Sequence, residues 1–460
     1  MTAPSKSLSS LLGAKRYSKI MCGILISNLE LDKAPAAYAA VKRRGPDLHN
    51  YSSWGDYNFL HALLSLTGDF TPQPVLDDEI AVIFNGEIYN YKYFGDYRSE
   101  AHAILDLYKR QGERAFEELD GEFVIIVIDL RSNEIIVVTD CFGTKPVWFG
   151  KTKAGNFAVC SLRSGITELG IDQAVEFSPN SITAISLQSL KITRRFNVKQ
   201  FDLEQNKDSL DNWCELFDRA VAKRARINNR KEPIFIGLSS GYDSGAIAES
   251  LKKRNSQVVA FSIYNEKILS DLLSRTRALA GNVDHVYLRD RRPIANYSST
   301  VERYDYRIFS LDGSYVEQGT NTHTDSGAQG LFEICKIADK NNLRVYLSGS
   351  GADEIYSDYG FRGTKIYRHS NFGGLYPDNL RAIFPWPSFF GSSMRSYLMK
   401  EEYVAGAFGI EGRYPFLDFA LVQEFLNLKA SVKNSSYKSP IAYYLKQSKF
   451  PFTENEKHGF

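Results

Sequence analysis

The sequence has no long apolar run, no paired-cysteine motif and no block of basic residues. No segment approaches the roughly 18 consecutive apolar residues that a membrane-crossing helix needs. The 5 cysteines are scattered, odd in number and without C-x-x-C spacing, which argues against structural zinc and a disulfide framework and favours a reducing, cytoplasmic location. The net charge of +2 argues against an electrostatic nucleic-acid surface. We therefore expect a globular protein that binds neither membranes nor nucleic acids.

The length and composition are those of a folded protein with more than one domain. The chain has 460 residues, of which 43% are hydrophobic and 24% charged. Such a chain has room for two or three domains with large cores. Residues 1–21 contain no acidic residue, and we interpret them as a leader or a mis-assigned start.

A loop of small residues follows a short apolar run in the second half of the chain. The run is Ile234–Gly237, the loop is Leu238–Gly241, and a helical pattern begins near Tyr242. A buried parallel strand would bring this loop to a sheet edge, where the amides at the start of the helix can bind phosphate oxygens. Asp243 could hold a magnesium ion on the same phosphates. The alternative is an ordinary strand–turn–helix corner.

A second loop of the same kind lies about a hundred residues further on. Val345–Leu347 is an apolar run, and Ser348–Glu354 follows it with the letters S-G-S-G-A-D-E. Loops at the carboxyl ends of two parallel strands can face one crevice. We therefore predict that Asp243 and Asp353 share one magnesium ion beside a nucleotide triphosphate.

These two loops resemble known signatures. The letters S-S-G-Y-D-S at 239–244 are similar to the S-G-G-x-D-S pyrophosphate loop of ATP pyrophosphatases, and L-S-G-S-G-A-D-E at 347–354 resembles the second signature of asparagine synthetases. Residues 409–418 and the segment around Lys457 also resemble asparagine synthetases, in which a lysine neutralises charge on the α-phosphate and the leaving pyrophosphate. The resemblance implies ATP contacts at Leu238, Ser239, Ser240, Gly241, Asp243, Ser244, Ile263, Ser348 and Gly349, the magnesium ligands Asp243 and Asp353, and a catalytic role for Lys457.

The first third of the chain carries a different set of motifs. A strand pattern begins at Cys22, which by itself would indicate a buried core cysteine. It is followed in order by R-G-P-D, F-N-G-E-I-Y-N, L-D-G-E-F and D-C-F-G-T-K-P. In this order and spacing, the five segments of residues 21–150 resemble the class II glutamine amidotransferase domain.

That resemblance implies a mechanism that needs a free chain start. In the family, an N-terminal cysteine attacks the side-chain amide of glutamine, and its own α-amine is the general base. The match therefore predicts removal of Met21 and exposure of Cys22. The Asn85 side chain and the Gly86 N–H would form the oxyanion hole, although N-G is also a common hairpin turn. The implied catalytic residues are Cys22, Asn85 and Gly86, and the implied glutamine contacts are Arg44, Leu64, Asn85, Gly86, Glu87 and Glu100.

Several positions depart from the family patterns. Leu63 stands where an arginine would pair with the glutamine carboxylate, and Arg44 is the candidate substitute. Glu100 replaces an aspartate, so free ammonia is an additional candidate nitrogen source. In the second half, Ser350 stands in place of a glutamate tied to the aspartyl-adenylate, while Ser240 replaces a glycine and Glu402 an aspartate. These changes leave the acceptor acid open.

The motifs together predict a two-domain enzyme. We expect an Ntn-hydrolase αββα sandwich over 22–200, a linker at 201–211, and an α/β parallel-sheet synthetase domain of the ATP-pyrophosphatase type over 212–460. The implied reaction uses ATP and Mg²⁺ to make an acyl-adenylate, which ammonia from glutamine converts into an amide after crossing an apolar passage between the domains. Asparagine synthesis from aspartate is the leading prediction.

Other readings stay open. One is amidation of a different acid. A second is a relative of β-lactam synthetase or a peptide cyclase, which closes a ring with an internal amine, and a third is a catalytically silent fold used for binding or regulation. The oligomeric state is open as well, with a homodimer among the alternatives.

Overall fold

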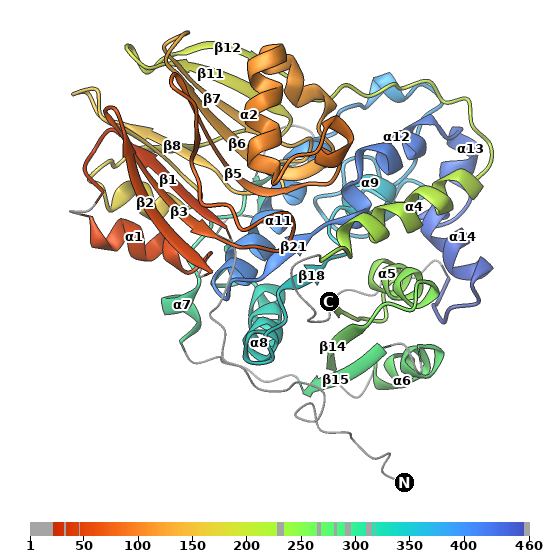
Figure 1. Ribbon diagram of the computed structural model, residues 1–460. Helices are drawn as coiled ribbons and strands as arrows, with labels where there is room; N and C mark the ends of the chain where they lie inside the picture. The colour runs from red at the N-terminus through yellow and green to blue at the C-terminus, as the bar shows by residue number, and fades with distance from the viewer. Residues whose placement is uncertain are drawn as a thin grey trace.

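The protein consists of a sandwich of two antiparallel sheets followed by a domain around one parallel sheet (Figure 1). The structure is a computed structural model, and it describes residues 22–31, 34–45, 47–227, 234–264, 268–279, 283–289, 296–309, 315–317 and 319–454. Both halves have the fold class that the sequence predicts.

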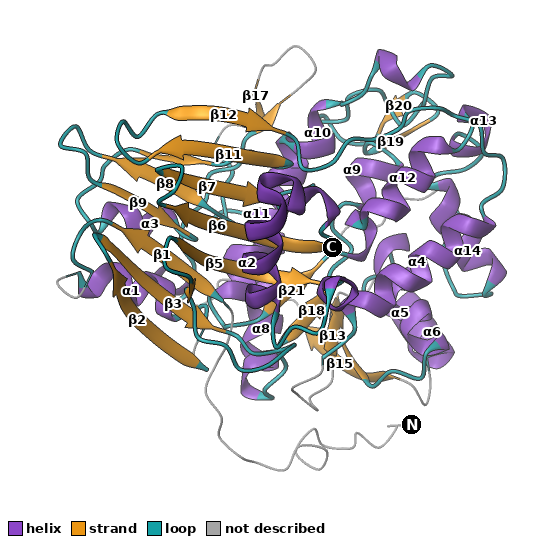
Figure 2. Ribbon diagram, turned by 45° about the horizontal axis from the view of Figure 1, so that its top comes forward, coloured by secondary structure: helices purple, strands orange, loops and turns teal. Residues whose placement is uncertain are grey.

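The N-terminal half packs two six-stranded sheets face to face, with strand orders β10-β8-β9-β1-β3-β2 and β12-β11-β7-β6-β5-β4. Helices α1 and α3 pack on the first sheet and α2 packs on the second, so the layers form an αββα sandwich (Figure 2). The strands are β1 (Gly23–Ser27), β2 (Leu48–Trp54), β3 (Tyr57–Leu63), β4 (Val75–Leu76), β5 (Ile80–Ile88), β6 (Gly121–Asp129), β7 (Glu134–Thr139), β8 (Trp148–Lys151), β9 (Phe157–Cys160), β10 (Ala174–Glu176), β11 (Ser181–Ser186) and β12 (Ile192–Phe196). The helices are α1 (Pro35–Lys42), α2 (Glu100–Gln111) and α3 (Arg163–Thr167), with 3-10 turns η2 (Tyr91–Phe94) and η3 (Gly112–Glu118).

Strand β6 shows why the sandwich strands are apolar on both faces. Val124 and Ile126 belong to the core between the two sheets, whereas Phe123 and Ile125 belong to the core beneath α2. Successive side chains of a strand point to opposite faces. Because a helix covers the outer face, both sets are buried and the strand reads as a continuous hydrophobic run.

The C-terminal half is built on a five-stranded sheet of order β15-β14-β13-β18-β21, in which all neighbours are parallel. The sheet strands are β13 (Ile234–Gly237), β14 (Val258–Tyr264), β15 (Val283–Arg289), β18 (Val345–Leu347) and β21 (Glu411–Arg413), and two small sheets pair β16 (Ile308–Phe309) with β17 (Tyr315–Glu317) and β19 (Gly360–Phe361) with β20 (Thr364–Lys365). The helices are α4 (Asp211–Arg224), α5 (Tyr242–Lys253), α6 (Leu269–Ala278), α7 (Tyr297–Thr300), α8 (Ser326–Lys340), α9 (Ala352–Tyr356), α10 (Pro387–Phe390), α11 (Ser392–Gly406), α12 (Phe419–Asn427), α13 (Ala430–Lys433) and α14 (Ser439–Gln447), with 3-10 turns η4 (Leu380–Ala382) and η5 (Pro415–Leu417).

Strands β13 and β18 are neighbours in this sheet although they are far apart in sequence. Both run in the same direction, so the loops that follow them leave from the same edge. This adjacency places the two predicted nucleotide loops side by side.

Helix α11 and strand β21 lie where the C-terminal domain meets the sandwich (Figure 1). The indole Nε1 of Trp148 on β8 donates a hydrogen bond of 3.0 Å to the Tyr403 hydroxyl on α11. The Lys145 ammonium, in the loop before β8, lies 2.8 Å from the Glu402 carboxylate. The two domains therefore share a buried polar interface.

The segment between the domains runs along α12. Strand β12 ends at Phe196 and α4 begins at Asp211, and the predicted linker 201–211 lies mostly between these points. The Lys207 N–H donates to the Asn427 carbonyl at 2.9 Å, and the Gln423 side chain donates to the Asp202 carbonyl at 2.8 Å. The connection is thus held against the C-terminal domain.

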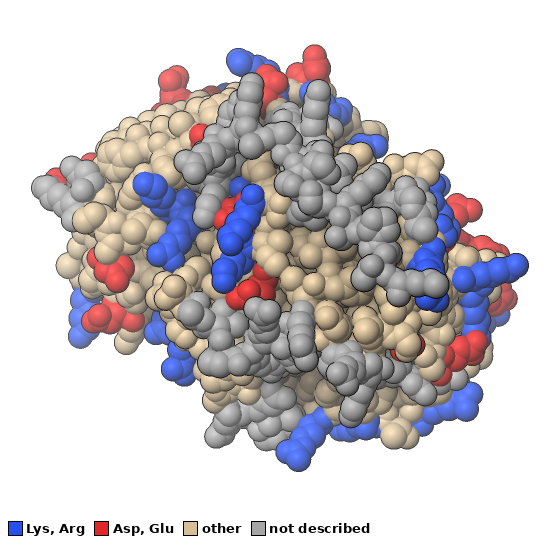
Figure 3. Space-filling model, turned by 90° about the horizontal axis from the view of Figure 1, so that it is seen from below, with Lys and Arg blue, Asp and Glu red and all other residues tan. Residues whose placement is uncertain are grey.

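Basic and acidic side chains are interspersed over the face seen in Figure 3. None of the helices in the described part of the chain has both the length and the apolar character required to cross a membrane.

Candidate functional site

The loop after β13 is braced by its own serines. The Ser239 hydroxyl accepts a hydrogen bond of 3.1 Å from the Gly241 N–H and lies 3.0 Å from the Ser244 hydroxyl at the start of α5. Arg275 on α6 donates to the Gly241 carbonyl at 2.7 Å and to the Ser239 carbonyl at 2.5 Å. The loop is therefore held in one shape at a helix N-terminus, as a phosphate site requires. Nothing in the sequence pattern marks Arg275 for this task.

The two predicted magnesium ligands converge on a single ammonium group. Lys438, just before α14, places its Nζ 2.7 Å from both carboxylate oxygens of Asp243 and 2.7 Å from Oδ1 of Asp353. Burial opposes the charge on Lys438, but the two aspartates outweigh it and raise the pKa of the ammonium well above its ordinary value. Asp243 and Asp353 thus lie on the same side of the domain, close enough to share a cation.

Asp243 and Asp353 lie in the first turns of α5 and α9, and the loop before α9 is in van der Waals contact with Asp243. A Cβ added to Gly349 would lie 2.9 Å from Cβ of Asp243, so the close approach requires glycine at this position. Lys438 is not among the residues predicted from the sequence, because a lone lysine before Ser439-Pro440 matches no pattern. The predicted ATP contacts Ser348 and Gly349 lie in this contact zone.

The donor set fits a magnesium ion. Mg²⁺ is usually held by one or two carboxylates together with water and substrate phosphates, and Asp243 and Asp353 already converge on one cation. Clusters of three or more metal-ligating side chains are absent from the described residues.

The remaining predicted nucleotide residues occupy the same sheet edge. The Leu238 N–H donates to the Phe261 carbonyl at 2.8 Å, and Ile263 follows on β14, half-buried. Ser240 is buried within the first loop. Their contacts with adenine or phosphate stay predictions. Lys457 lies outside the described residues.

The Cys22 thiol lies in the sandwich, against the end of β3. Its Sγ accepts a hydrogen bond of 3.1 Å from the Leu64 N–H and lies 3.6 Å from the Leu64 carbonyl. Burial is the main reason that the pKa of the thiol is raised, and the nearby carboxylates of Glu411, Glu87 and Glu100 add to the rise. Leu64 therefore contacts the predicted nucleophile through its backbone.

Asn85 offers a buried hydrogen-bond donor that has no partner. Its side chain is 1% exposed, and no acceptor among the described residues pairs with its Nδ2. A buried donor left unpaired is costly, so an amide aimed this way suits an oxyanion that is present only during reaction.

Gly86 lies inside β5, so the hairpin-turn interpretation of Asn85-Gly86 is wrong. Its φ is +122°, and a Cβ at this position would lie 1.9 Å from the Glu122 carbonyl on β6. The reason for glycine here is the close approach of the neighbouring strand.

Glu87 and Glu100 form an acidic pair beside Thr67. The Thr67 hydroxyl lies 2.7 Å from Glu87 Oε2 and 3.2 Å from Glu100 Oε1, and Arg413 on β21 lies 2.9 Å from Glu87 Oε1. Burial raises the pKa of Glu100 to about 7 and that of Glu87 well above its usual range, although Arg413 counteracts the rise at Glu87. The pair suits a positively charged amine, and sequence analysis did not foresee that the other domain supplies its arginine.

The contacts of Arg44 do not support a role in binding glutamine. Its guanidinium donates to the Glu402 carbonyl and carboxylate, each at 3.0 Å, and to the Cys22 carbonyl at 3.3 Å. With 1% of its surface exposed, Arg44 is fully engaged in the domain interface. The predicted pairing of Arg44 with the glutamine carboxylate stays a prediction that these contacts do not support.

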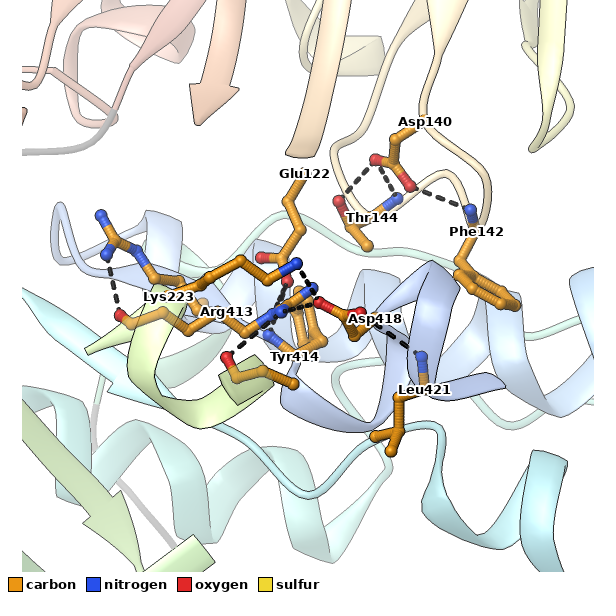
Figure 4. Close-up of polar contacts among 12 residues, drawn as sticks. Glu122, Asp140, Phe142, Thr144, Lys223, Arg413, Tyr414, Asp418 and Leu421 are labelled. Carbon is orange, nitrogen blue, oxygen red and sulfur yellow. Dashed lines mark hydrogen bonds and ion pairs between the residues drawn. The ribbon is translucent and has the colours of Figure 1, made fainter. Parts of the chain in front are cut away.

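A second cluster of charged residues lies at the interface between the two domains (Figure 4). Arg224 on α4 lies 2.6 Å from Glu122 and 2.9 Å from Asp418, and the Tyr414 N–H donates to the same Glu122 oxygen at 2.9 Å. A cavity of about 220 Å³ lies beside this cluster, lined by both domains. Seven charged residues line this cavity, which therefore differs from the apolar ammonia passage that we expected: Asp120, Glu122, Asp140, Lys199, Lys223, Arg224 and Asp418.

A carboxylate from α11 lies beside Ser350, the residue that stands in place of the family's glutamate. The Ser350 hydroxyl donates a hydrogen bond of 2.8 Å to Glu401 Oε1 on α11. Glu402, the next residue, faces Arg44, Lys145 and the Tyr414 hydroxyl at the domain interface instead. Its buried carboxylate thus holds the two domains together, a structural role that the sequence did not suggest.

Two family models match the chain. Residues 21–196 match the glutamine amidotransferase domain, and residues 212–403 match asparagine synthase. Asparagine synthetase (glutamine-hydrolyzing) 2 of Arabidopsis thaliana is 24% identical over 454 residues, which cover 90% of this chain and 71% of that protein. The asparagine synthetase (glutamine-hydrolyzing) of Homo sapiens is 25% identical over 440 residues, covering 85% of this chain and 74% of that protein.

A solved structure of the allosteric regulatory enzyme of purine biosynthesis aligns with a TM-score of 0.34 and 14% identity, over 77% of this chain and 98% of that chain. This similarity is too weak to support an inference, and the fold assignment rests on the sheets described above.

Fold and sites define a class of protein that joins a glutamine amidotransferase sandwich to a parallel-sheet domain with a paired-loop crevice. The two family models cover most of the chain and leave little outside this pairing. The chain belongs to the asparagine synthetase family of glutamine-hydrolysing ligases.

Proposed function

We propose that this protein amidates a carboxylic acid with nitrogen from glutamine, at the expense of ATP and through an acyl-adenylate. Aspartate is the first acceptor to test, with asparagine as the product. Support comes from family membership and from the two sites, which supply the groups that each half of the reaction needs.

In the glutaminase half, Cys22 attacks the side-chain amide of glutamine. Its α-amine serves as the base once residues 1–21 are removed. The amide of Asn85 and the N–H of Gly86 stabilise the oxyanion, and Glu87 and Glu100 receive the substrate's α-ammonium group. The buried, unpaired Nδ2 of Asn85 supports this assignment.

In the synthetase half, the backbone of 239–244 and 348–349 binds the nucleotide phosphates at the start of α5. Asp243 and Asp353 would hold Mg²⁺, which supplies charge neutralisation for the transferred nucleotide when bound. Lys438 balances the two carboxylates and, like Lys457, offers positive charge to the phosphates.

The observation that carries the proposal is the convergence of Asp243 and Asp353 on one cation. Two acidic loops from distant parts of the chain form one cation site at the edge where a nucleotide binds in parallel-sheet folds. The free state of the five cysteines favours a reducing compartment, and we infer a cytoplasmic location on that basis.

The test is pyrophosphate release with ATP, Mg²⁺ and a panel of acids beginning with aspartate, with glutamine or ammonium chloride as the nitrogen source. We expect release with both sources, and loss of the glutamine-dependent reaction alone in Cys22→Ala. Cys214→Ala, at a half-buried thiol on α4, is the matched control and should change neither reaction. Release without any nitrogen source consumed would indicate a ring-closing enzyme, and no release with any acid would refute the proposal.

Processing at the chain start can be checked separately. Mass spectrometry of the purified active protein should find Cys22 at the N-terminus. A protein that still carries residues 1–21 should show no glutaminase activity while ammonia-dependent activity persists, because Cys22 then has a peptide nitrogen in place of an amine.

A further inference from the structure

A buried carboxylate beside the nucleotide loops has no role in the reaction so far described. Glu401 on α11 is 7% exposed, and its Oε1 accepts the hydrogen bond from Ser350. Its other oxygen, Oε2, is buried and has no hydrogen-bond partner among the described residues. Because burying a carboxylate oxygen without a donor is costly, Oε2 marks a place where a substrate can bring a donor.

This carboxylate lies at the nucleotide crevice. Ser350, its hydrogen-bond donor, follows Gly349, which touches Asp243. Glu401 is therefore separated from the predicted magnesium site by one loop.

The same turn of α11 also reaches the glutaminase half. Glu402 pairs with Arg44, and Arg44 donates to the carbonyl of Cys22. Successive residues of a helix point about 100° apart, so Glu402 faces the sandwich while Glu401 faces the loop. Ammonia released near Cys22 would meet the synthetase domain at this turn.

We propose that Glu401 is the general base of the amide-forming step, an inference that rests on the proposed function. The nitrogen lone pair of ammonia forms a bond to the acyl carbon, one N–H proton passes to Glu401 Oε2, and the C–O bond to AMP breaks with its electron pair leaving on AMP. The products are the amide, AMP and a protonated Glu401. Ser350 keeps the carboxylate in place.

The environment of Glu401 supports this use. Burial raises the pKa of the carboxyl, against the opposing effects of Lys400 and the hydroxyls of Ser348 and Ser350. A carboxylate with a raised pKa is a better proton acceptor near neutral pH. The hydrogen bond from Ser350 holds the Glu401 carboxylate beside a loop in which serine replaces the family's glutamate.

The experiment separates the two half-reactions in the full chain. Adenylation is measured as exchange of labelled pyrophosphate into ATP with aspartate, and amide formation as asparagine made from ammonium chloride. In Glu401→Gln we expect amide formation to fall about 100-fold or more, with exchange and the glutaminase rate of Cys22 each within about twofold of wild type. Moving the carboxylate to the loop, in E401Q/S350E, should recover at least about tenfold of the lost amide rate.

The controls keep the inference open to refutation. Glu333→Gln, at a half-buried carboxylate on the neighbouring α8, should change neither step. Ser350→Ala removes only the hydrogen bond and should lower amide formation about three- to tenfold; this variant decides the matter if E401Q does not fold. An unchanged amide rate in E401Q or S350A, or equal losses in exchange and amide formation, would overturn the inference.

Failure of the proposed function has a different signature. If the wild-type protein catalyses no exchange with any acid, the adenylation itself is absent and both proposals fall. If wild-type exchange occurs and E401Q still makes amide at the wild-type rate, only the role of Glu401 is refuted.

Discussion

The predicted glutamine pocket and the predicted nucleotide crevice each contain two carboxylates, but they obtain their counter-charge differently. In the crevice, Asp243 and Asp353 share Lys438, which belongs to the same domain. In the pocket, Glu87 lies against Arg413, which belongs to the other domain. The crevice is thus electrostatically self-contained, whereas the pocket depends on the contact between domains.

This difference has a consequence for coupling between the sites. Arg413 ends β21, the strand next to β18, and β18 leads into the loop that carries Asp353. Movement of that sheet edge would shift the arginine on Glu87. The comparison therefore predicts that changes in the synthetase sheet alter glutamine binding, while changes in the pocket leave adenylation intact.

The largest effect that separates the two sites is expected at Asn85. Asn85→Ala removes an oxyanion donor and should lower the glutaminase kcat about 100- to 1,000-fold, or about 2.7–4 kcal/mol. Ammonia-dependent amide formation in the same preparation serves as the control and should stay near wild type. A glutaminase rate within a fewfold of wild type would remove Asn85 from the oxyanion hole.

The next largest effect on glutaminase kinetics is expected at Arg413, and it tests whether the predicted glutamine pocket depends on the other domain. Arg413→Met leaves Glu87 and Glu411 without their buried partner and should lower the free energy of unfolding by about 3–5 kcal/mol. The KM for glutamine should rise about tenfold or more, measured by glutaminase kinetics at a temperature where the variant is folded. Arg303→Met removes an exposed ion pair and should change neither quantity. An unaltered glutamine KM in R413M would break the comparison.

A smaller effect, on the free energy of unfolding, is expected at Lys438, and it tests whether the nucleotide crevice is independent of the glutaminase domain. Lys438→Met removes the buried ammonium that two neighbouring carboxylates share and should lower the free energy of unfolding by about 3 kcal/mol, without altering glutaminase kinetics. Mg²⁺ should raise the Tm of this variant more than that of wild type, because the ion replaces the lost charge. Lys446→Met, at an exposed lysine on α14, is the matched control. Equal Mg²⁺ shifts in all three proteins would argue against a metal at Asp243 and Asp353.

The smallest effect concerns pH. Burial raises the pKa of Glu100 from 4.5 to about 7, so the folded protein binds the proton more tightly than the unfolded chain does. Between these two values the stability should fall as pH rises, by at most about 3 kcal/mol in total. Glu100→Gln should flatten this slope and be more stable than wild type at pH 8, as urea unfolding at pH 5 and pH 8 would show. Parallel slopes in the two proteins would refute the raised pKa.

The sequence predicted the chain segments that form both candidate sites. The small-residue loops at 238–241 and 348–351 follow short apolar strands, and the rule that parallel strands end at one sheet edge was enough to bring Asp243 and Asp353 together. The motif around Asn85 was found too, but its glycine was assigned to a turn as one alternative. Gly86 is required because the Glu122 carbonyl of the neighbouring strand approaches it, and no local pattern reports such an approach.

The residues whose roles sequence reasoning missed are all buried charged side chains. Arg275 lies on α6, Lys438 lies just before α14, Glu401 lies in α11, and Arg413 ends β21. A single lysine, arginine or glutamate has no local signature, because its surroundings depend on which elements pack against it. The same limit applies to Arg44, which the domain interface engages.

The sequence by itself determined the fold class of both halves and the two paired loops, because apolar periodicity and small-residue loops act on the backbone over short distances; the nucleophile at Cys22 stays a prediction. Only the tertiary structure decided which charge faces which: Lys438 between two aspartates, Arg413 on Glu87, and Glu401 behind Ser350. A buried charge is stable only beside a compensating group, and that neighbour is chosen by packing between segments that lie far apart along the chain.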